Sequence, residues 1–192
     1  MAPLGAARAL ITAGGVADLG KLELIETQTI SSSTANMNFT NIKEDIYEVH
    51  LLQISNFSTT TSTDQFLEMR LSNDSGSSYE SSNYMYSFQY GGTNGAFGDL
   101  KSTSASEFDM LVGNASSTGS GNGYMYLYNL GDSSKYSHLT NHTFAINNAG
   151  IGYFHFGGYA YTVAETIDAI RLFPSGDNIL SLTASLYGLA ES

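Results

Sequence analysis

The residue types that could carry chemistry in this chain are histidines and carboxylates. The four histidines are His50, His138, His142 and His155. His138 and His142 are four residues apart, a spacing that on a helix places both side chains on one face as a zinc pair. Their segment, SHLTNHT, has no helical pattern and no glutamate in the metalloprotease position, so we expect no zinc. We expect His155 to be a half-buried strand residue and His50 to alternate with the apolar face of its strand.

Paired carboxylates could form the acid and base of a glycosidase. The candidates Glu68, Asp109, Glu165 and Asp168 are scattered along the chain, and no sequence pattern pairs them. We therefore favour solvated surface charge. The chain also lacks a G-x-S-x-G elbow and a P-loop. The sequence accordingly predicts no catalytic residue and no enzymatic activity.

A polar turn offers the one candidate for a metal ion. Asn73, Asp74 and Ser75 precede Gly76 and carry the hard oxygen ligands that calcium prefers. Their spacing does not match an EF-hand loop, and a turn stabilised by Asx hydrogen bonds explains the residues equally well. We expect no bound metal or other cofactor and keep calcium as the weaker alternative.

Tyrosine is abundant, with 13 copies and no tryptophan in the chain. Six of these tyrosines lie in two segments with period-two spacing: Tyr84, Tyr86, Tyr90, Tyr124, Tyr126 and Tyr128. Such residues could stack across a pair of strands. Core and cross-strand packing is the favoured interpretation, and a sugar- or protein-binding face is the alternative.

Composition excludes several classes of function. Seven Lys and Arg against 18 Asp and Glu give a formal net charge of -11, so nucleic acids and anionic membrane surfaces are not expected partners. The chain contains no cysteine, which rules out disulfides and thiolate chemistry. No apolar run reaches the roughly 18 residues of a membrane span. The first residues carry no basic region, so we expect no cleaved signal peptide.

Period-two hydrophobicity dominates the chain from about Leu22 onward. Leu67, Met69 and Leu71, for example, alternate with Glu68 and Arg70. The segments predicted as strands are 22–30, 37–40, 46–54, 66–72, 84–90, 108–112, 124–128, 151–156, 166–173 and 179–187. Connectors rich in Gly, Asn and Ser separate them. About ten strands with short loops predict an all-β antiparallel β-sandwich over residues 21–192, and we expect jelly-roll wiring.

Residues 1–20 are expected to form an extended N-terminal arm. Glycines and alanines interrupt any strand there, whereas Leu4, Leu10 and Ile11 are apolar anchors. From composition alone, such a segment either frays or packs on another surface.

Four stretches resemble the small β-sandwich virion proteins of tailed phages, including cyanophages. They are the opening PLGAARALI, LGKLELIETQTISSS from Leu19, RLSNDSGSSYESSNYMY from Arg70, and AIRLFPSGDNILSLTASLYGL from Ala169. The resemblance implies a non-enzymatic component of the particle surface, with the major capsid protein or other virion proteins as partners. It also implies a homo-oligomer, as a trimer in many such proteins.

The resemblance leaves two roles open. A capsid decoration (cement) protein fits the short chain and single domain, and the arm would then hold the capsid or a neighbouring subunit through Leu4, Arg8, Leu10 and Ile11. A tail-fibre module that binds a receptor or glycan fits the tyrosine-rich strands and polar loops. We expect the decoration role.

Overall fold

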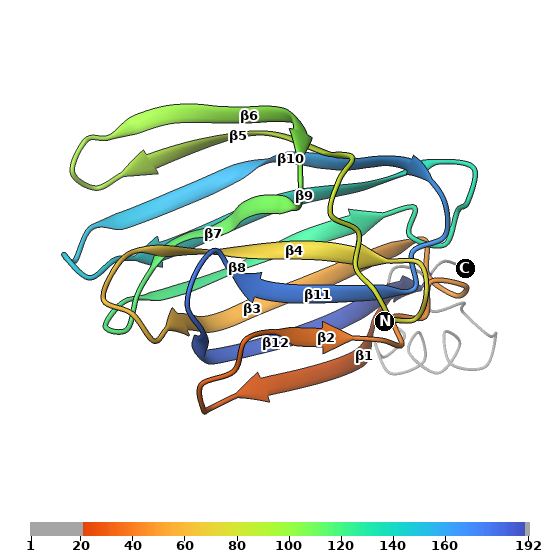
Figure 1. Cartoon of the computed structure of the whole chain (residues 1–192), viewed down its shortest axis with the longest axis horizontal. Coiled ribbons are helices and arrows are strands. Elements are labelled where there is room, and N and C mark those ends of the chain that lie inside the picture. Colours follow the sequence, from red (N-terminus) through yellow and green to blue (C-terminus); the bar gives the residue numbers. More distant parts are fainter. Residues whose placement is uncertain (1–20, 191–192) are drawn as a thin grey trace, which may run out of the picture.

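The computed structural model describes residues 21–190, and every regular element in that range is a β-strand. The strands form two antiparallel sheets that pack face to face (Figure 1). Their bounds are β1 Lys21–Ile30, β2 Met37–Phe39, β3 Val49–Thr59, β4 Gln65–Ser72, β5 Tyr84–Gly92, β6 Phe97–Ala105, β7 Phe108–Ala115, β8 Ser120–Tyr128, β9 Tyr136–Ile146, β10 Gly152–Ala164, β11 Ala169–Pro174 and β12 Ile179–Ala190. The predicted all-β antiparallel sandwich is confirmed. Residues 21–190 contain no helix of the length and apolarity that crossing a bilayer requires.

The two sheets differ in size. The large sheet has eight strands in the order β1-β12-β3-β8-β9-β10-β5-β6, and the small sheet has four in the order β2-β11-β4-β7. A jelly roll has eight strands wound as two Greek keys, so the structure does not confirm that wiring. The first and last described strands, β1 and β12, are neighbours, and β1 and β6 form the two edges of the large sheet.

Alternation along the strands fills the space between the sheets. Leu67, Met69 and Leu71 of β4 are fully buried, as the sequence predicted, and they belong to one core cluster with large-sheet residues such as Leu52 and Leu127. Burying each side chain of this size contributes about 1.5–3 kcal/mol. We call the face of the large sheet that meets the small sheet its inner face, and the opposite one its outer face.

Two strands of the large sheet were not predicted. In β9 the inward-facing residues include Ser137, Asn141 and Thr143, so its alternation is regular but not hydrophobic. In β6 most side chains are exposed on both faces, because the strand lies beyond the small sheet. The prediction for 179–187 is wrong at one position: a register shift at the start of β12 leaves Leu180 exposed.

The two sheets come closest where β7 crosses β9 and β10. Asn141 Nδ2 and Thr143 Oγ1 of β9 donate to the Leu111 carbonyl at 2.8 and 2.9 Å. One strand further, the buried ring of His155 lies against Gly113, where a β-carbon would come within 1.9 Å of the ring. Only glycine therefore allows this approach. Burial lowers the pKa of His155 to about 4, so the ring is neutral.

Gly113→Ala should lower the free energy of unfolding by about 1–3 kcal/mol, because the new methyl group forces the buried ring or the strand to move. Thermal and denaturant unfolding measure this change. Gly158→Ala is the matched control, since nothing lies within 4 Å of its β-carbon position, and its stability should change by less than about 0.5 kcal/mol. Equal effects of the two substitutions would contradict the close contact.

Candidate functional site

The structure brings two of the four candidate carboxylates together. The carboxyl groups of Glu68 on β4 and Asp109 on β7 are close enough to raise the pKa of Glu68, and Asp109 Oδ2 accepts a hydrogen bond from Tyr86 Oη at 3.2 Å. Glu68 is only 9% exposed. The prediction of solvated surface charge is therefore wrong for this pair. The reason is that Asp109 lies at an irregular part of β7, beside the positive φ of Met110 and a register shift against β4.

Burial and mutual repulsion hold a proton on this pair. Burial, followed by the charges of Asp109 and Glu107, raises the pKa of Glu68 to about 8. Burial also raises the pKa of Asp109. Two adjacent carboxyl groups resemble an acid–base pair in chemical terms, but neither lines the groove described below.

The pair should make stability depend on pH. The folded-state pKa of Glu68 lies above its ordinary value of 4.5, so its contribution is fully present below about pH 4.5 and is lost as the pH rises through 8. Glu68→Gln keeps a donor for Asp109 and removes the titration. Between pH 5 and 9 the wild type should lose about 2 kcal/mol or more relative to this variant, as measured by urea unfolding. Asp45→Asn, at an exposed site, should show no such difference.

The remaining carboxylates stabilise the polar turn after β4. Asp168 accepts from Ser75 N at 2.9 Å, and Glu165 accepts from Asn73 Nδ2 at 2.8 Å. Asp74 accepts from Ser72 Oγ and from both the amide and the hydroxyl of Ser78. Both carboxylate oxygens of Asp74 and the Ser75 hydroxyl are therefore engaged in hydrogen bonds within the protein. Among residues 21–190 no group of three or more His, Asp or Glu side chains is arranged to hold a metal ion.

The histidines divide between the two faces of the large sheet. His138 and His142 are exposed on the outer face of β9. His155 is buried, deeper than predicted, and its Nδ1 has no hydrogen-bond partner in the described part of the chain. The prediction for His50 is wrong: the side chain is fully buried on the apolar face, where Nε2 lies 2.8 Å from the Ile42 carbonyl.

The six tyrosines do not form one face. Strands β5 and β8 are separated by β9 and β10, so the expected stacking across a strand pair is absent. Tyr84, Tyr86 and Tyr90 of β5 face the core, where Tyr84 is fully buried. The tyrosines of β8 point to the outer face: Tyr124, Tyr126 and Tyr128.

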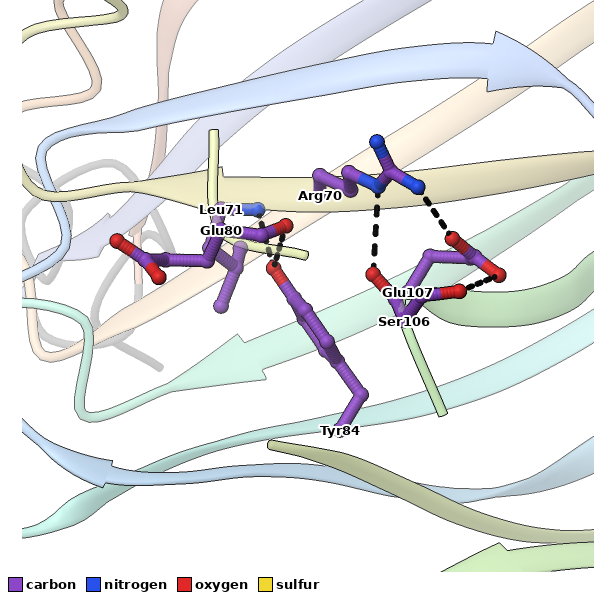
Figure 2. A network of polar contacts seen from close by, with 6 residues as sticks. All are labelled: Arg70, Leu71, Glu80, Tyr84, Ser106 and Glu107. Carbon is purple, nitrogen blue, oxygen red and sulfur yellow. Dashed lines mark hydrogen bonds and ion pairs between the residues drawn. The ribbon is translucent and has the colours of Figure 1, made fainter. Parts of the chain in front are cut away.

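Tyr84 connects the two sheets. Its hydroxyl accepts from the Leu71 amide at 2.9 Å and donates to the Glu80 carbonyl at 3.3 Å (Figure 2). The Glu80 amide in turn donates to the Leu71 carbonyl. The tyrosine thus occupies the place of a strand partner for β4, which at Leu71 extends beyond its pairing with β7. Burial raises the pKa of this hydroxyl, so it stays protonated.

A second polar cluster beside it positions the turn before β7. Arg70 donates to the Ser106 carbonyl at 3.2 Å and forms an ion pair with Glu107 at 2.8 Å (Figure 2). The guanidinium also lies 5.2 Å from the centre of the Phe173 ring. The Tyr84 hydroxyl is buried and the Arg70 cluster is part-buried, and both link segments of the sandwich.

The outer face of the large sheet carries an apolar cluster at one end. The outer aromatic cluster consists of Phe97, Phe144, Ile146, Phe154 and Phe156. Phe97 is 70% exposed and Phe144 46%. The ring centres of Phe97 and Phe154 are 6.1 Å apart, and those of Phe154 and Phe156 are 6.0 Å apart. Contiguous exposed apolar side chains of this kind are typical of surfaces that bind another molecule.

A groove lies on the same outer face of the large sheet. It has a volume of about 1050 Å³ and lies over Gly158, whose missing side chain leaves its floor open. Tyr128 and His138 line one part of it, and Met85 and Lys101 line another. Hydroxyls of Ser87, Thr103 and Thr140 complete the lining. Apolar floor and polar rim together suit a small polar ligand or a peptide.

Sequence reasoning missed most of this surface. Phe97 and Phe144 lie in β6 and β9, the two unpredicted strands, and Gly158 lies beyond the segment 151–156. The available signal was the period-two spacing of Phe154 and Phe156 on one face of their strand, but the sequence does not indicate whether that face is inside or outside. The predicted capsid- or subunit-binding arm, with Leu4, Arg8, Leu10 and Ile11, lies outside the described residues.

Comparison with protein-family models, with curated proteins and with solved structures finds no match to this chain.

Proposed function

We propose that this chain is a structural protein of a phage particle, and that it decorates the capsid shell. The observation that carries the proposal is the outer aromatic cluster, an apolar area that three strands present on one face. The four stretches similar to phage β-sandwich proteins support the same function.

The chemistry of the cluster favours a protein surface as partner. Aromatic side chains are enriched at the centre of protein interfaces, where each buries a large area at low entropic cost. The strand registers place Asn122, His142, Gln89 and Asp99 beside the cluster, and these side chains provide a polar rim. Repetition of the chain over a symmetric shell would add multivalency to a moderate single contact.

The test is binding of the full-length chain to capsids that lack it, measured by co-sedimentation. Phe144→Ser combined with Phe156→Ser should reduce occupancy at least tenfold, because two half-exposed rings of the docking area are lost. Leu24→Ser on β1, also an exposed apolar residue, should bind like the wild type.

Removal of residues 1–20 should abolish binding and leave the circular dichroism spectrum unchanged. Full occupancy of the truncated chain would reject the arm as a tether.

A tail module that binds a receptor glycan is the second candidate, and the groove over Gly158 favours it. Sugar rings pack on apolar floors and tyrosine faces while hydroxyl and imidazole groups bind their oxygens. The outer tyrosines extend beside the groove, with the Tyr124 and His142 rings 5.9 Å apart.

Gly158→Leu separates the two candidates. The leucine fills the open floor, since nothing lies within 4 Å of the β-carbon position, so the fold should tolerate it. If the chain binds a glycan, affinity on a glycan array should fall at least tenfold while capsid occupancy stays unchanged. If neither the wild type nor the variant binds any glycan, the receptor role is rejected.

A further inference from the structure

The edge strand β6 has an unusual environment. It hydrogen-bonds β5 on one side, and no other described strand pairs with it. β5 is also the only strand against which β6 packs extensively, and Figure 1 shows the β5–β6 hairpin at the top of the molecule. Each face of β6 exposes an apolar residue, Phe97 outside and Leu100 inside. An uncovered edge of this length is a template for pairing with another strand.

The register of the hairpin shows which backbone groups are free. In the turn, the Gly92 amide donates to the Ala96 carbonyl, and Gly98, Leu100 and Ser102 lie opposite Tyr90, Phe88 and Tyr86. Hydrogen-bonded pairs recur at every second residue of an antiparallel ladder, so the amides and carbonyls of these three residues point toward β5.

The groups of the intervening residues point away from β5. These residues are Phe97, Asp99 and Lys101. Their amides and carbonyls thus lie along the open edge, ready to pair with another strand.

The charges on this edge are self-complementary. Asp99 and Lys101 are exposed and share the outer face, and within the described residues neither forms an ion pair. If a second β6 pairs antiparallel with its two-fold axis at Leu100, each Asp99 lies directly opposite the other chain's Lys101. Opposite charges in directly paired positions stabilise a sheet.

We propose that two copies of this chain associate edge to edge through β6, with the two-fold axis at Leu100. The contact forms about four central backbone hydrogen bonds, between Asp99 of each chain and Lys101 of the other. It joins two large sheets into one continuous sheet. On the inner face the two Leu100 side chains meet and extend the apolar row that begins at the buried Phe88.

Charge selects this register over its neighbours. An axis at Lys101 places lysine against lysine, and an axis at Asp99 places aspartate against aspartate; like charges in these positions are destabilising. A lone lysine usually protects an edge from pairing. Here the aspartate two residues away turns that protection into selective pairing with a second copy.

The rest of the molecule supports a second copy as the occupant. The other edge of the large sheet, β1, has a bulge between Leu24 and Glu26, a feature that disfavours edge pairing. This contact goes beyond the proposed function. It shares Phe97 with the outer aromatic cluster and Lys101 with the groove. It does not use Phe144, Phe156 or Gly158, whose substitutions test the proposed function, so the two proposals can fail separately.

Cysteine cross-linking tests the register. The native chain has no cysteine, and residues facing each other across the axis are about 4.5 Å apart at Cα, a separation that a disulfide spans. Leu100→Cys should therefore form a disulfide-linked dimer in the full-length protein under mild oxidation. Ser102→Cys is the control, because its two copies lie about 13 Å apart along the strands and should stay monomeric on a non-reducing gel.

Charge exchange tests the interaction in the native sequence context. By sedimentation velocity, Asp99→Lys and Lys101→Asp should each weaken dimerisation at least tenfold, and the double exchange should restore it. Asp45→Lys makes the same charge change at an exposed site elsewhere and should leave the dimer unchanged. A wild-type monomer at high micromolar concentration, a dimer or trimer insensitive to both single exchanges, or equal cross-linking of both cysteine variants would overturn the proposal.

Discussion

The contact between β7 and the large sheet is the constraint on which the rest of the sandwich depends. Gly113 allows the His155 ring to approach the strand, and the Leu111 carbonyl receives two side-chain hydrogen bonds from β9. These contacts hold one edge of the small sheet against β9 and β10. Strands β5 and β6 lie beyond those two in the large sheet, so the small sheet covers the inner face of β6 least. The position of β7 over β9 and β10 therefore encloses the core there and leaves β6 without a covering strand.

Buried polar groups near β7 follow from this geometry. Since β4 continues past the end of its pairing with β7, its Leu71 amide needs another acceptor, and the Tyr84 hydroxyl provides it (Figure 2). The irregular part of β7 brings Asp109 to Glu68, where the cost of burying two carboxylates is reduced by keeping one proton between them. These groups have the residue types of an active site, but their surroundings are those of a structural network. Residue identity alone therefore does not distinguish chemistry from architecture in this chain.

The outer face of the large sheet carries several exposed aromatic side chains. The alternation that sends Leu127 and Met125 into the core sends the tyrosines of β8 outward. In β9 and β10 the same rule places Phe144 and Phe156 on the surface. A sheet that needed only to cover a core would present polar residues there. The aromatic cluster, the groove and the edge of β6 are features of one sheet, and β6 connects them because Phe97 belongs to the cluster and Lys101 lines the groove.

The sequence by itself determined the fold class, because period-two alternation in segments such as 66–72 requires a sheet with one buried face. It also predicted that Leu67, Met69 and Leu71 belong to the core. It did not reveal β9, whose inward residues are largely polar, or β6, which has no buried face to produce a pattern. Only the tertiary structure paired Glu68 with Asp109 and gathered Phe97, Phe144 and Phe154, because strands distant in sequence become neighbours through the sheet order. It also decided which face of each strand is outside, since alternation defines two faces but packing against a second sheet chooses between them.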